Sequence, residues 1–369
     1  GQPPTTRAES QAWTASRPRS PDVASPAQAA MTRPMLFVPA EWEEHVAVWM
    51  AWPHLEHEWP DLAGAREEIA AFVRAIAETE TVELLVDPSV DVVPELGPNV
   101  NVHRVAYGDA WTRDTSCIFA RDHQGPVALC FRFDGWGGKY LMPGDESLSG
   151  RIATQCGLRA RPSDLVLEGG GIELDGAGAL MTTVDCVVPR NAAPFVGRQV
   201  DSIEEARRVL DEEELDLDLA LLAAFGVQRV IWLEGRLIND HTDGHIDTLA
   251  RFVRPGEALA MTPAAGDPNG AMLLGLIEQM LAAGLVVHEI PSPGVVKNAD
   301  GELLPASYTN YYLANEQVLV PIYGSPHDEA AVAAIAKLFP GRRTRGLMAK
   351  KILEGGGAFH CITQQQPKL

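Results

Sequence analysis

Five side chains of reactive types lie in polar segments of the chain: Cys361, His245, Asp247, Asp114 and Glu168. A cysteine thiolate attacks carbon, and a histidine moves protons near neutral pH. Carboxylates bind a planar cation through paired, charge-assisted hydrogen bonds. One nucleophile, one proton carrier and three carboxylates therefore fit attack on the central carbon of a guanidinium group. Because these residues come from separate segments, the fold must bring them together.

Each residue also has a plainer interpretation. Cys361 stands close to Phe359 and Ile362, and a cysteine in such surroundings is more often buried and inert. Asp114 follows an arginine, so it could belong to a surface ion pair. A His-x-Asp pair is often a solvated strand end, but within a strand His245 and Asp247 would share one face.

A metal site is a further alternative for the histidine segment. His241 and His245 are four residues apart with Asp247 close by, which could suit zinc. That spacing requires a helix, whereas Thr242, Asp243 and Gly244 are typical of a turn. We therefore predict no metal here.

Two identical glycine-rich stretches surround two of the reactive residues. The letters LEGGG occur at 167–171, where Glu168 opens the triplet, and at 353–357, shortly before Cys361. Glycine lets a backbone approach a ligand closely. The polar run Gln364–Gln366 also interrupts what would otherwise continue as an apolar strand. We expect these triplets, including Gly356 and Gly357, to lie against the bound cation.

The elements that position these segments repeat along the chain. Five helical patterns are predicted at 61–80, 145–157, 201–226, 267–284 and 327–341, and a β-rich run follows each. Gly157, Gly226, Gly284 and Gly341 recur at intervals of 69, 58 and 57 residues. Such a period suits one helix with three or four strands. The pattern predicts five ββαβ modules closed into a ring, with the polar segments pointing at its axis, as one α/β domain over 34–369.

Composition limits the partners. The formal net charge of −20 disfavours nucleic acid and anionic membrane and favours small cations. The five cysteines show no paired spacing, which indicates a reducing compartment, and we expect a cytoplasmic protein. Residues 1–33 are rich in Pro, Ala, Ser and Thr and are predicted to be a disordered extension. Met31 could be the natural start, and a transit peptide is the alternative.

Several long motifs carry a family resemblance. PAEWEEHVAVWMAWPH, AWTRDT, LEGGGIELDGAGALMTT, TDGHIDTLARFVRPGE, LPASYTNYYLAN and GGGAFHCITQQQP occur in this order between about Pro39 and Pro367. The chain resembles the agmatine deiminase branch of the guanidino-group-modifying superfamily, which is related to bacterial peptidylarginine deiminases. The resemblance implies a pseudo-fivefold α/β propeller and a hydrolase that needs no metal or organic cofactor.

The resemblance also implies a role for each residue. Cys361 matches the nucleophile that forms a covalent thiouronium, and His245 matches the general acid and base. Asp114 and Asp247 match the clamps on the guanidinium group. Glu168 matches the acid that orients the histidine or the guanidinium.

The substrate follows less directly from the motifs. The resemblance implies agmatine, converted to N-carbamoylputrescine and ammonia. At the substrate's tail we expect Trp111 and the loop residues Glu56, Glu58 and Trp59, which would favour a carboxylate-free amine. Leu55 replaces an arginine common in the family. The alternatives are a deiminase of peptidyl or otherwise modified arginine, an amidinotransferase, and a binding protein without activity. The predicted partners are a small guanidino substrate and a second copy of the chain in a homodimer.

Overall fold

The computed structural model describes residues 36–369, so the prediction for 1–33 lies outside the described residues. Residues 36–369 form five small sheets, and each sheet contains an antiparallel pair and at least one parallel pair of strands. An antiparallel pair can be joined by a short turn, whereas a parallel pair needs a crossover such as a helix. A hairpin followed by a helical crossover to a parallel strand is the predicted ββαβ module, and such pairs recur in the sheets.

Three modules have the simplest form of this plan. Each has a hairpin, a helical crossover and a third strand that pairs in parallel with the second strand of the hairpin. The first contains β8 (Ile172–Leu174), β9 (Ala179–Thr183) and β10 (Arg229–Leu233). The second contains β11 (Ala250–Arg254), β12 (Glu257–Thr262), α9 (Gly270–Ala282) and β13 (Val286–Pro291). The third contains β14 (Tyr312–Leu313), β15 (Gln317–Ile322), α10 (Asp328–Leu338) and β16 (Arg343–Met348).

The other two modules join distant parts of the chain. One sheet has the order β1, β5, β6, β7, formed by Leu36–Phe37, Ile118–Asp122, Gly125–Arg132 and Arg159–Val166, with α5 (Leu148–Gln155) as its crossover. The other has the order β17, β2, β3, β4, formed by Gln364–Pro367, His45–Ala51, Val82–Val86 and Val100–Arg104, with α2 (Leu62–Ala77) as its crossover. Strand β17 is antiparallel to β2, so this module takes one strand from near each end of residues 36–369.

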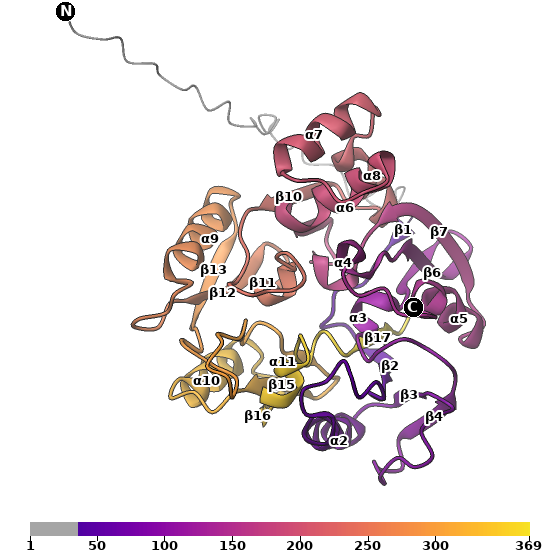
Figure 1. Cartoon of the computed structure of the whole chain (residues 1–369), viewed down its shortest axis with the longest axis vertical. Helices are drawn as coiled ribbons and strands as arrows, with labels where there is room; N and C mark the ends of the chain where they lie inside the picture. The colour runs from indigo at the N-terminus through magenta and orange to yellow at the C-terminus, as the bar shows by residue number, and fades with distance from the viewer. Residues whose placement is uncertain (1–35) are drawn as a thin grey trace, which may run out of the picture. The chain divides into compact units, whose positions relative to one another are not determined.

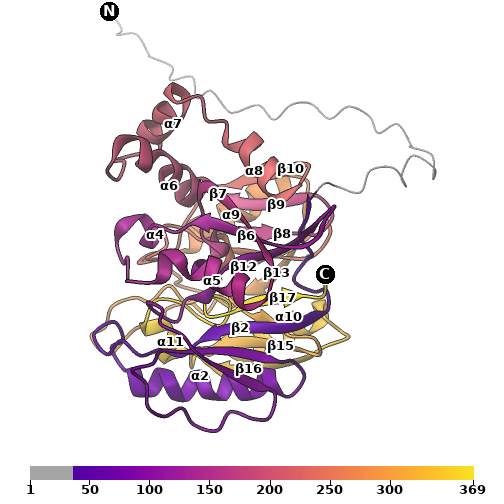
Figure 2. The ribbon, with the colours of Figure 1, turned by 90° about the vertical axis from the view of Figure 1, so that its right-hand side faces the viewer.

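The modules surround a common centre, with α2 and α7 (Ile203–Glu212) at the periphery (Figures 1 and 2). The five polar segments are the connections that lead from one sheet to the next: 105–117, 167–171, 234–249, 292–311 and 349–363. Because each connection leaves one module and enters its neighbour, it crosses near the axis of the ring. The predicted α/β class is confirmed, the five sheets agree with the five predicted modules, and the connections between them carry the reactive residues.

Most predicted helices are present, but one is wrong. The segment 201–226 contains two helices, α7 and α8 (Leu217–Phe225), because Glu214 adopts a left-handed φ of 55° and Asp216 caps α8 by accepting from Leu219 N at 3.1 Å. Helix α6 (Val184–Val196) was not predicted, because Pro189 and Pro194 lie inside it. The β-rich run after 341 ends in the short helix α11 (Lys350–Glu354).

The core connects the outer helices to the centre. Phe72 of α2 stacks on Phe359 with ring centroids 4.0 Å apart and planes tilted by 6°. Both rings are fully buried, and Phe359 lies two residues before Cys361. Burial of an aromatic pair of this kind fixes the connection before β17 against α2. Among the described residues, no helix is long and apolar enough to cross a membrane.

Candidate active site

The reactive residues lie on short turns in the connections between modules. Asp114 belongs to α3 (Thr112–Thr115), and Glu168 caps the 3₁₀ turn η2 (Gly169–Gly171). His245 and Asp247 belong to the 3₁₀ turn η3 (Ile246–Thr248), where His245 is the N-terminal cap. The expectation that this pair lies in a strand is therefore wrong, because the turn 242–244, with Asp243 and Gly244 at positive φ, delivers the chain directly into η3.

Cys361 is buried and is held by a neighbouring connection. Its Sγ accepts a hydrogen bond from Asn310 Nδ2 at 3.2 Å, and its backbone N–H donates to Asn310 Oδ1 at 3.3 Å. Sγ also lies 3.7 Å from Asp247 Oδ2. Burial first, and then the charges of Asp247 and Asp114, raise the pKa of the Cys361 thiol well above its ordinary value. The site without a bound cation therefore favours the neutral thiol.

Asp247 is fully buried and presents one free oxygen. Its Oδ2 accepts from His360 Nδ1 at 2.7 Å, while Oδ1 has no hydrogen-bond partner within residues 36–369. Burial by itself would raise the pKa of this carboxyl, but the hydrogen bond from His360 and the nearby positive charges lower it. An ionised carboxylate with an unused oxygen is suited to accept from a cation.

Asp114 is fixed by two donors. Its Oδ1 accepts from Gly170 N at 2.8 Å, and its Oδ2 accepts from Trp136 Nε1 at 2.9 Å. Trp136 adopts φ 56° and ψ 53°, a left-handed conformation that costs free energy for a bulky residue. Its ring packs edge-on against Phe133 with centroids 4.9 Å apart. Burial raises the pKa of Asp114, and Asp247 and Glu168 add to this rise, while His245 opposes it.

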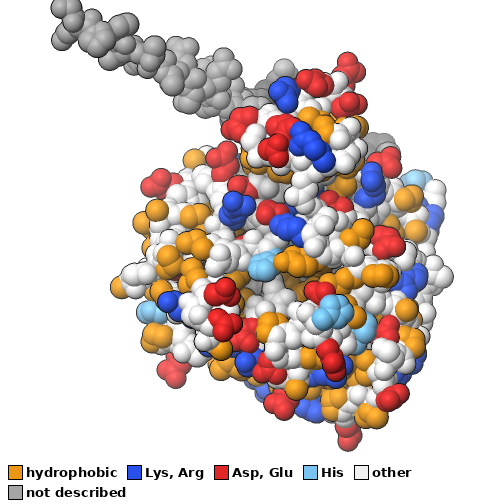
Figure 3. Space-filling model, viewed as in Figure 1, with side chains coloured by type: hydrophobic (Ala, Val, Ile, Leu, Met, Phe, Trp, Pro, Cys, Tyr) orange, Lys and Arg blue, Asp and Glu red, His pale blue; other side chains and the backbone are white. Residues whose placement is uncertain are grey.

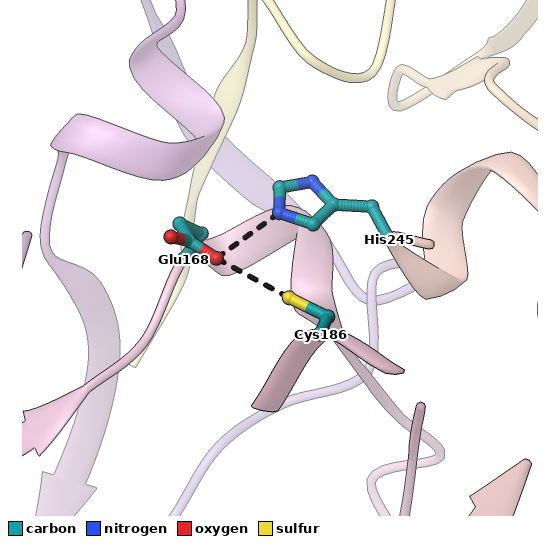
Figure 4. Close-up of side chains that lie close together, drawn as sticks. All are labelled: Glu168, Cys186 and His245. Atoms are coloured by element: carbon teal, nitrogen blue, oxygen red, sulfur yellow. Dashed lines mark hydrogen bonds and ion pairs between the residues drawn. The ribbon is translucent and has the colours of Figure 1, made fainter. Parts of the chain in front are cut away.

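Glu168 contacts the Nε2 atom of His245, and Cys186 contacts the same carboxylate (Figure 4). Its Oε2 lies 3.2 Å from His245 Nε2 and accepts from Cys186 Sγ at 3.4 Å, and its Oε1 accepts from Arg190 Nε at 2.9 Å. Burial alone would raise the pKa of Glu168, but Arg190 and His245 lower it to about 2. Burial would likewise lower the pKa of His245, but Asp114, Cys186 and Glu168 raise it well above its ordinary value. His245 Nδ1 has no partner among the described side chains and lies 3.8 Å from Asp114 Oδ1.

Gly170 marks the point where these groups converge. A Cβ atom at this position would lie 2.5 Å from His245 Nδ1 and 3.0 Å from both Asp114 Oδ1 and Asp247 Oδ2. The other glycines approach protein groups as well. A Cβ at Gly357 would lie 2.7 Å from the Trp111 ring and 3.0 Å from Cys361 Sγ. The triplets are thus required by contacts within the protein, and their contact with a bound cation stays a prediction.

The predicted tail residues lie beside the second triplet. Trp59 stacks on Trp111 with ring centroids 5.2 Å apart, and both indoles donate to Asp109, at 3.0 Å and 3.1 Å. Burial, to which Glu58 adds, raises the pKa of Asp109 to about 6. Glu58 is half-buried and contacts an exposed histidine, whereas Glu56 is exposed. Gly356 adopts a φ of 126°, which few other residues could adopt.

The face shown in Figure 3 carries a mixed set of side chains around its centre. Histidine, acidic and basic side chains are interspersed there with hydrophobic ones. The charge that would attract a cation is therefore that of the buried carboxylates rather than of an acidic surface patch.

Two clusters of side chains have the composition of metal ligands. The first contains Glu168, Cys186 and His245, and the second contains Glu41, Glu173 and His360. In each cluster the carboxylates already bind an arginine: Arg190 for the first, and Arg251 for the second. A guanidinium cation thus occupies the place where a metal would supply positive charge, so neither cluster fits a metal.

Sequence reasoning missed four residues of this region: Cys186, Arg190, Asn310 and His360. Cys186 and Arg190 lie on α6, whose prolines hide the helix. Asn310 lies in the motif LPASYTNYYLAN, and His360 directly precedes the cysteine. For Asn310 and His360, the signal that could have identified them is that they are polar side chains within motifs that contain predicted site residues or lie beside them.

Five ββαβ modules around a cysteine, a histidine and buried carboxylates define a class of enzyme that hydrolyses C–N bonds in linear amidines. The chain belongs to the Porphyromonas-type peptidyl-arginine deiminase family, whose model matches residues 37–367.

Individual relatives agree with this assignment. The agmatine deiminase of Stutzerimonas stutzeri is 34% identical over 366 residues, covering 90% of this chain and 95% of that protein. The structure of the Enterococcus faecalis agmatine deiminase matches with a TM-score of 0.77 at 26% identity, covering 90% of this chain and 96% of that one. A substrate-bound cysteine-to-serine variant of the C. jejuni agmatine deiminase matches with a TM-score of 0.78 at 25% identity, covering 90% and 97%.

Proposed function

We propose that this protein hydrolyses agmatine to N-carbamoylputrescine and ammonia. The observation that carries the proposal is the convergence at Gly170 of His245 Nδ1, Asp114 Oδ1 and Asp247, next to the Cys361 thiol. Asp247 Oδ1 has no protein donor within residues 36–369 and can accept from a guanidinium N–H. The names of the relatives support agmatine as the guanidino compound.

The first half of the reaction replaces an amino group by sulfur. Entry of the cationic guanidinium lowers the raised pKa of the Cys361 thiol, and the thiol proton is lost to solvent. The thiolate adds to the central carbon, which gives a tetrahedral adduct. Imidazolium His245 donates its Nδ1 proton to one amino group, the C–N bond breaks, and ammonia leaves. A positively charged thiouronium on Cys361 remains.

The second half releases the product. Neutral His245 takes a proton from a water molecule, and the resulting hydroxide adds to the thiouronium carbon. The C–S bond then breaks, Cys361 leaves as a thiolate, and the hydroxyl group loses its proton to solvent, which gives the neutral ureido product. Glu168 stabilises the imidazolium form of His245. In the first half this favours the form that donates a proton to the leaving amino group, and in the second half it favours the uptake of a proton from water.

The protein can distinguish guanidino compounds by the charged group at the end opposite the guanidinium. Agmatine ends in an ammonium group, whereas arginine adds a carboxylate. Trp59, Trp111 and Asp109 form a buried aromatic and acidic wall, with Glu58 beside it. An ammonium is attracted to such a wall, and a carboxylate is repelled. We infer that agmatine is preferred over free arginine.

Ammonia release from a panel of guanidines tests the proposal. We expect kcat/KM to be highest for agmatine, lower for a blocked arginine amide and lowest for free arginine. The Cys361→Ser variant, with an oxygen in place of sulfur, should release no ammonia. The half-buried thiol of Cys130 on β6 offers a matched control, because Cys130→Ser should keep full activity. Preference for peptidyl arginine over agmatine would assign the protein to the alternative substrate class, and an active Cys361→Ser variant would contradict the mechanism.

A further inference from the structure

A chain of polar contacts connects Asp247 to two residues that the proposed mechanism does not use, His360 and Glu41. Asp247 Oδ2 is 2.7 Å from His360 Nδ1, and His360 Nε2 is 2.7 Å from Glu41 Oε1. Glu41 in turn binds Arg113 Nη1 at 3.3 Å and contacts Arg251. The His360 and Asp247 side chains are 0% exposed, whereas the Glu41 side chain is 13% exposed. The proposed mechanism uses Asp247 and neither His360 nor Glu41.

The two short contacts define the form of the His360 ring. Ionised carboxylates are acceptors only, so each ring nitrogen must donate a proton to satisfy both Asp247 and Glu41. His360 is therefore a cation held between two anions. Asp247 consequently turns Oδ2 toward His360 and leaves Oδ1 without a partner among the described residues.

We propose that His360, held in place by Glu41, is a positioning residue for Asp247. It fixes the rotation of the carboxylate, with Oδ2 3.7 Å from Cys361 Sγ and Oδ1 left free to accept from the guanidinium, and its charge keeps the buried carboxylate ionised. The inference rests on the proposed function, because it concerns the group that would bind the guanidinium. It adds to that function a residue that does not itself touch the substrate.

The side chain of His360 can be changed without releasing the nucleophile. The backbone N–H of His360 donates to Asn310 Oδ1 at 3.0 Å, and that oxygen also accepts from Cys361 N. The carbonyl of His360 accepts from Arg113 Nε at 3.3 Å. These backbone contacts do not involve the imidazole ring, so a substitution of the ring addresses Asp247 rather than Cys361.

Other charged groups also face the carboxylates of this chain. Asp247 is faced by His360, His245, Arg251, Asp114 and Cys361, and Glu41 is faced by His360, Arg251, Arg113 and Glu173. A change in the pH dependence of binding is therefore assigned to His360 only by comparing variants that leave the other groups in place.

Three substitutions separate orientation from charge. In His360→Asn the side-chain amide nitrogen takes the place of Nδ1, so the bond to Asp247 is kept and the charge is lost. In His360→Gln the amide nitrogen takes the place of Nε2, so the bond to Glu41 is kept and the one to Asp247 is lost. Glu41→Gln leaves His360 in place and weakens its support. His288→Asn is the control, because His288 makes a similar bond to Glu257 at 2.7 Å on a half-exposed edge.

The measurement is the dissociation constant of agmatine by calorimetry between pH 5 and 9, with every variant in the Cys361→Ser background so that no turnover occurs. Loss of the neighbouring cation raises the pKa of Asp247, so the acidic limb of binding should move to higher pH by about one unit or more in His360→Asn. Glu41→Gln should move it in the same direction by less. At the pH of tightest binding, His360→Gln should weaken binding by about 10- to 100-fold, because the carboxylate loses a hydrogen bond to a charged group. His360→Asn should weaken it only a few-fold.

Two failures can be told apart. If Cys361→Ser alone binds no agmatine at any pH, the proposed function is contradicted. If it binds agmatine and the acidic limb stays in place in both His360→Asn and Glu41→Gln, the positioning role of His360 is contradicted. An equal shift in His288→Asn would contradict it as well. Should His360→Asn fail to fold, Glu41→Gln decides alone, because its substitution preserves the shape of the side chain.

Discussion

Replacing Glu168 by glutamine removes one charge from the group that supports His245. The substitution keeps the size of the side chain, but the new amide can no longer neutralise Arg190, which is 5% exposed and bound at 2.9 Å. Arg190 keeps Asp243 as a second anionic partner at 2.9 Å, so the loss of the Glu168 charge costs less than the about 3–5 kcal/mol expected for a buried arginine left with no partner. The pKa of Glu168 falls from its ordinary value of 4.5 to about 2 in the folded protein. Since a factor of ten in an acid constant is worth about 1.4 kcal/mol, the ionised form contributes about 3 kcal/mol.

The pH range of this contribution follows from its sign. A folded-state pKa below the unfolded value stabilises the protein above pH 4.5, and this stabilisation is lost as the pH falls toward 2. Between pH 6 and pH 3.5 the loss is on the order of 1 kcal/mol. The free energy of unfolding in urea should therefore differ between wild type and Glu168→Gln by less at pH 3.5 than at pH 6.

The same substitution should change catalysis in a second, separate way. Without the negative charge of Glu168, the raised pKa of His245 falls, so the imidazolium loses its proton at lower pH. The basic limb of the kcat profile for ammonia release should shift to lower pH by about one unit, with Asp114 retaining part of the support. A basic limb at the wild-type pH would contradict the assignment of His245 as the acid supported by Glu168. A stability difference that does not depend on pH would contradict the ionised Glu168–Arg190 pair.

Three further predictions address other parts of the site. Asp247→Asn should chiefly raise KM and His245→Ala should chiefly lower kcat, because one group binds the cation and the other moves a proton in the transition state; the reverse division would exchange their roles. Gly170→Ala should lower kcat by about 100-fold by displacing His245 and the two aspartates, whereas Gly150→Ala, an open helical position, should keep full activity; equal kcat for the two variants would refute the close approach. Dialysis against EDTA followed by elemental analysis should leave ammonia release unchanged, and zinc lost in step with activity would contradict the absence of a required metal.

Much of the fold could be predicted because the repeat is local. The helices that end at Gly157, Gly226 and Gly284 are followed by strands, and all three glycines adopt positive φ in the structure. Ser202 likewise has a glutamate three residues later, a local signal for a helix start, and its Oγ accepts from Glu205 N at 3.0 Å at the beginning of α7. Such signals act over a few residues, so they survive without knowledge of the tertiary structure.

The partners of the reactive residues could not be predicted in the same way. Cys186 and Arg190 lie on a helix containing prolines, which intrinsic propensity opposes and tertiary packing overrides. His245 and Asp247 share a site through a 3₁₀ turn rather than through the alternation of a strand. The bond from Asn310 to Cys361 joins residues 51 positions apart, a relation that no local pattern encodes.

The pairing of β17 with β2 connects the completion of the fold to the position of the Cys361 thiol. Gln364–Pro367 pair with β2, and Cys361 lies only a few residues before this seam. During synthesis the module that contains β2 is therefore incomplete until β17 is made about 300 residues later. Contacts between such distant segments form slowly because of the entropy of loop closure. Until the last connection is made, the Asn310 bonds to Cys361 and the Phe72–Phe359 stack are absent as well, although every reactive side chain but one has already been made. We therefore expect Cys361 to become reactive only after β17 has paired with β2, when the five modules are complete.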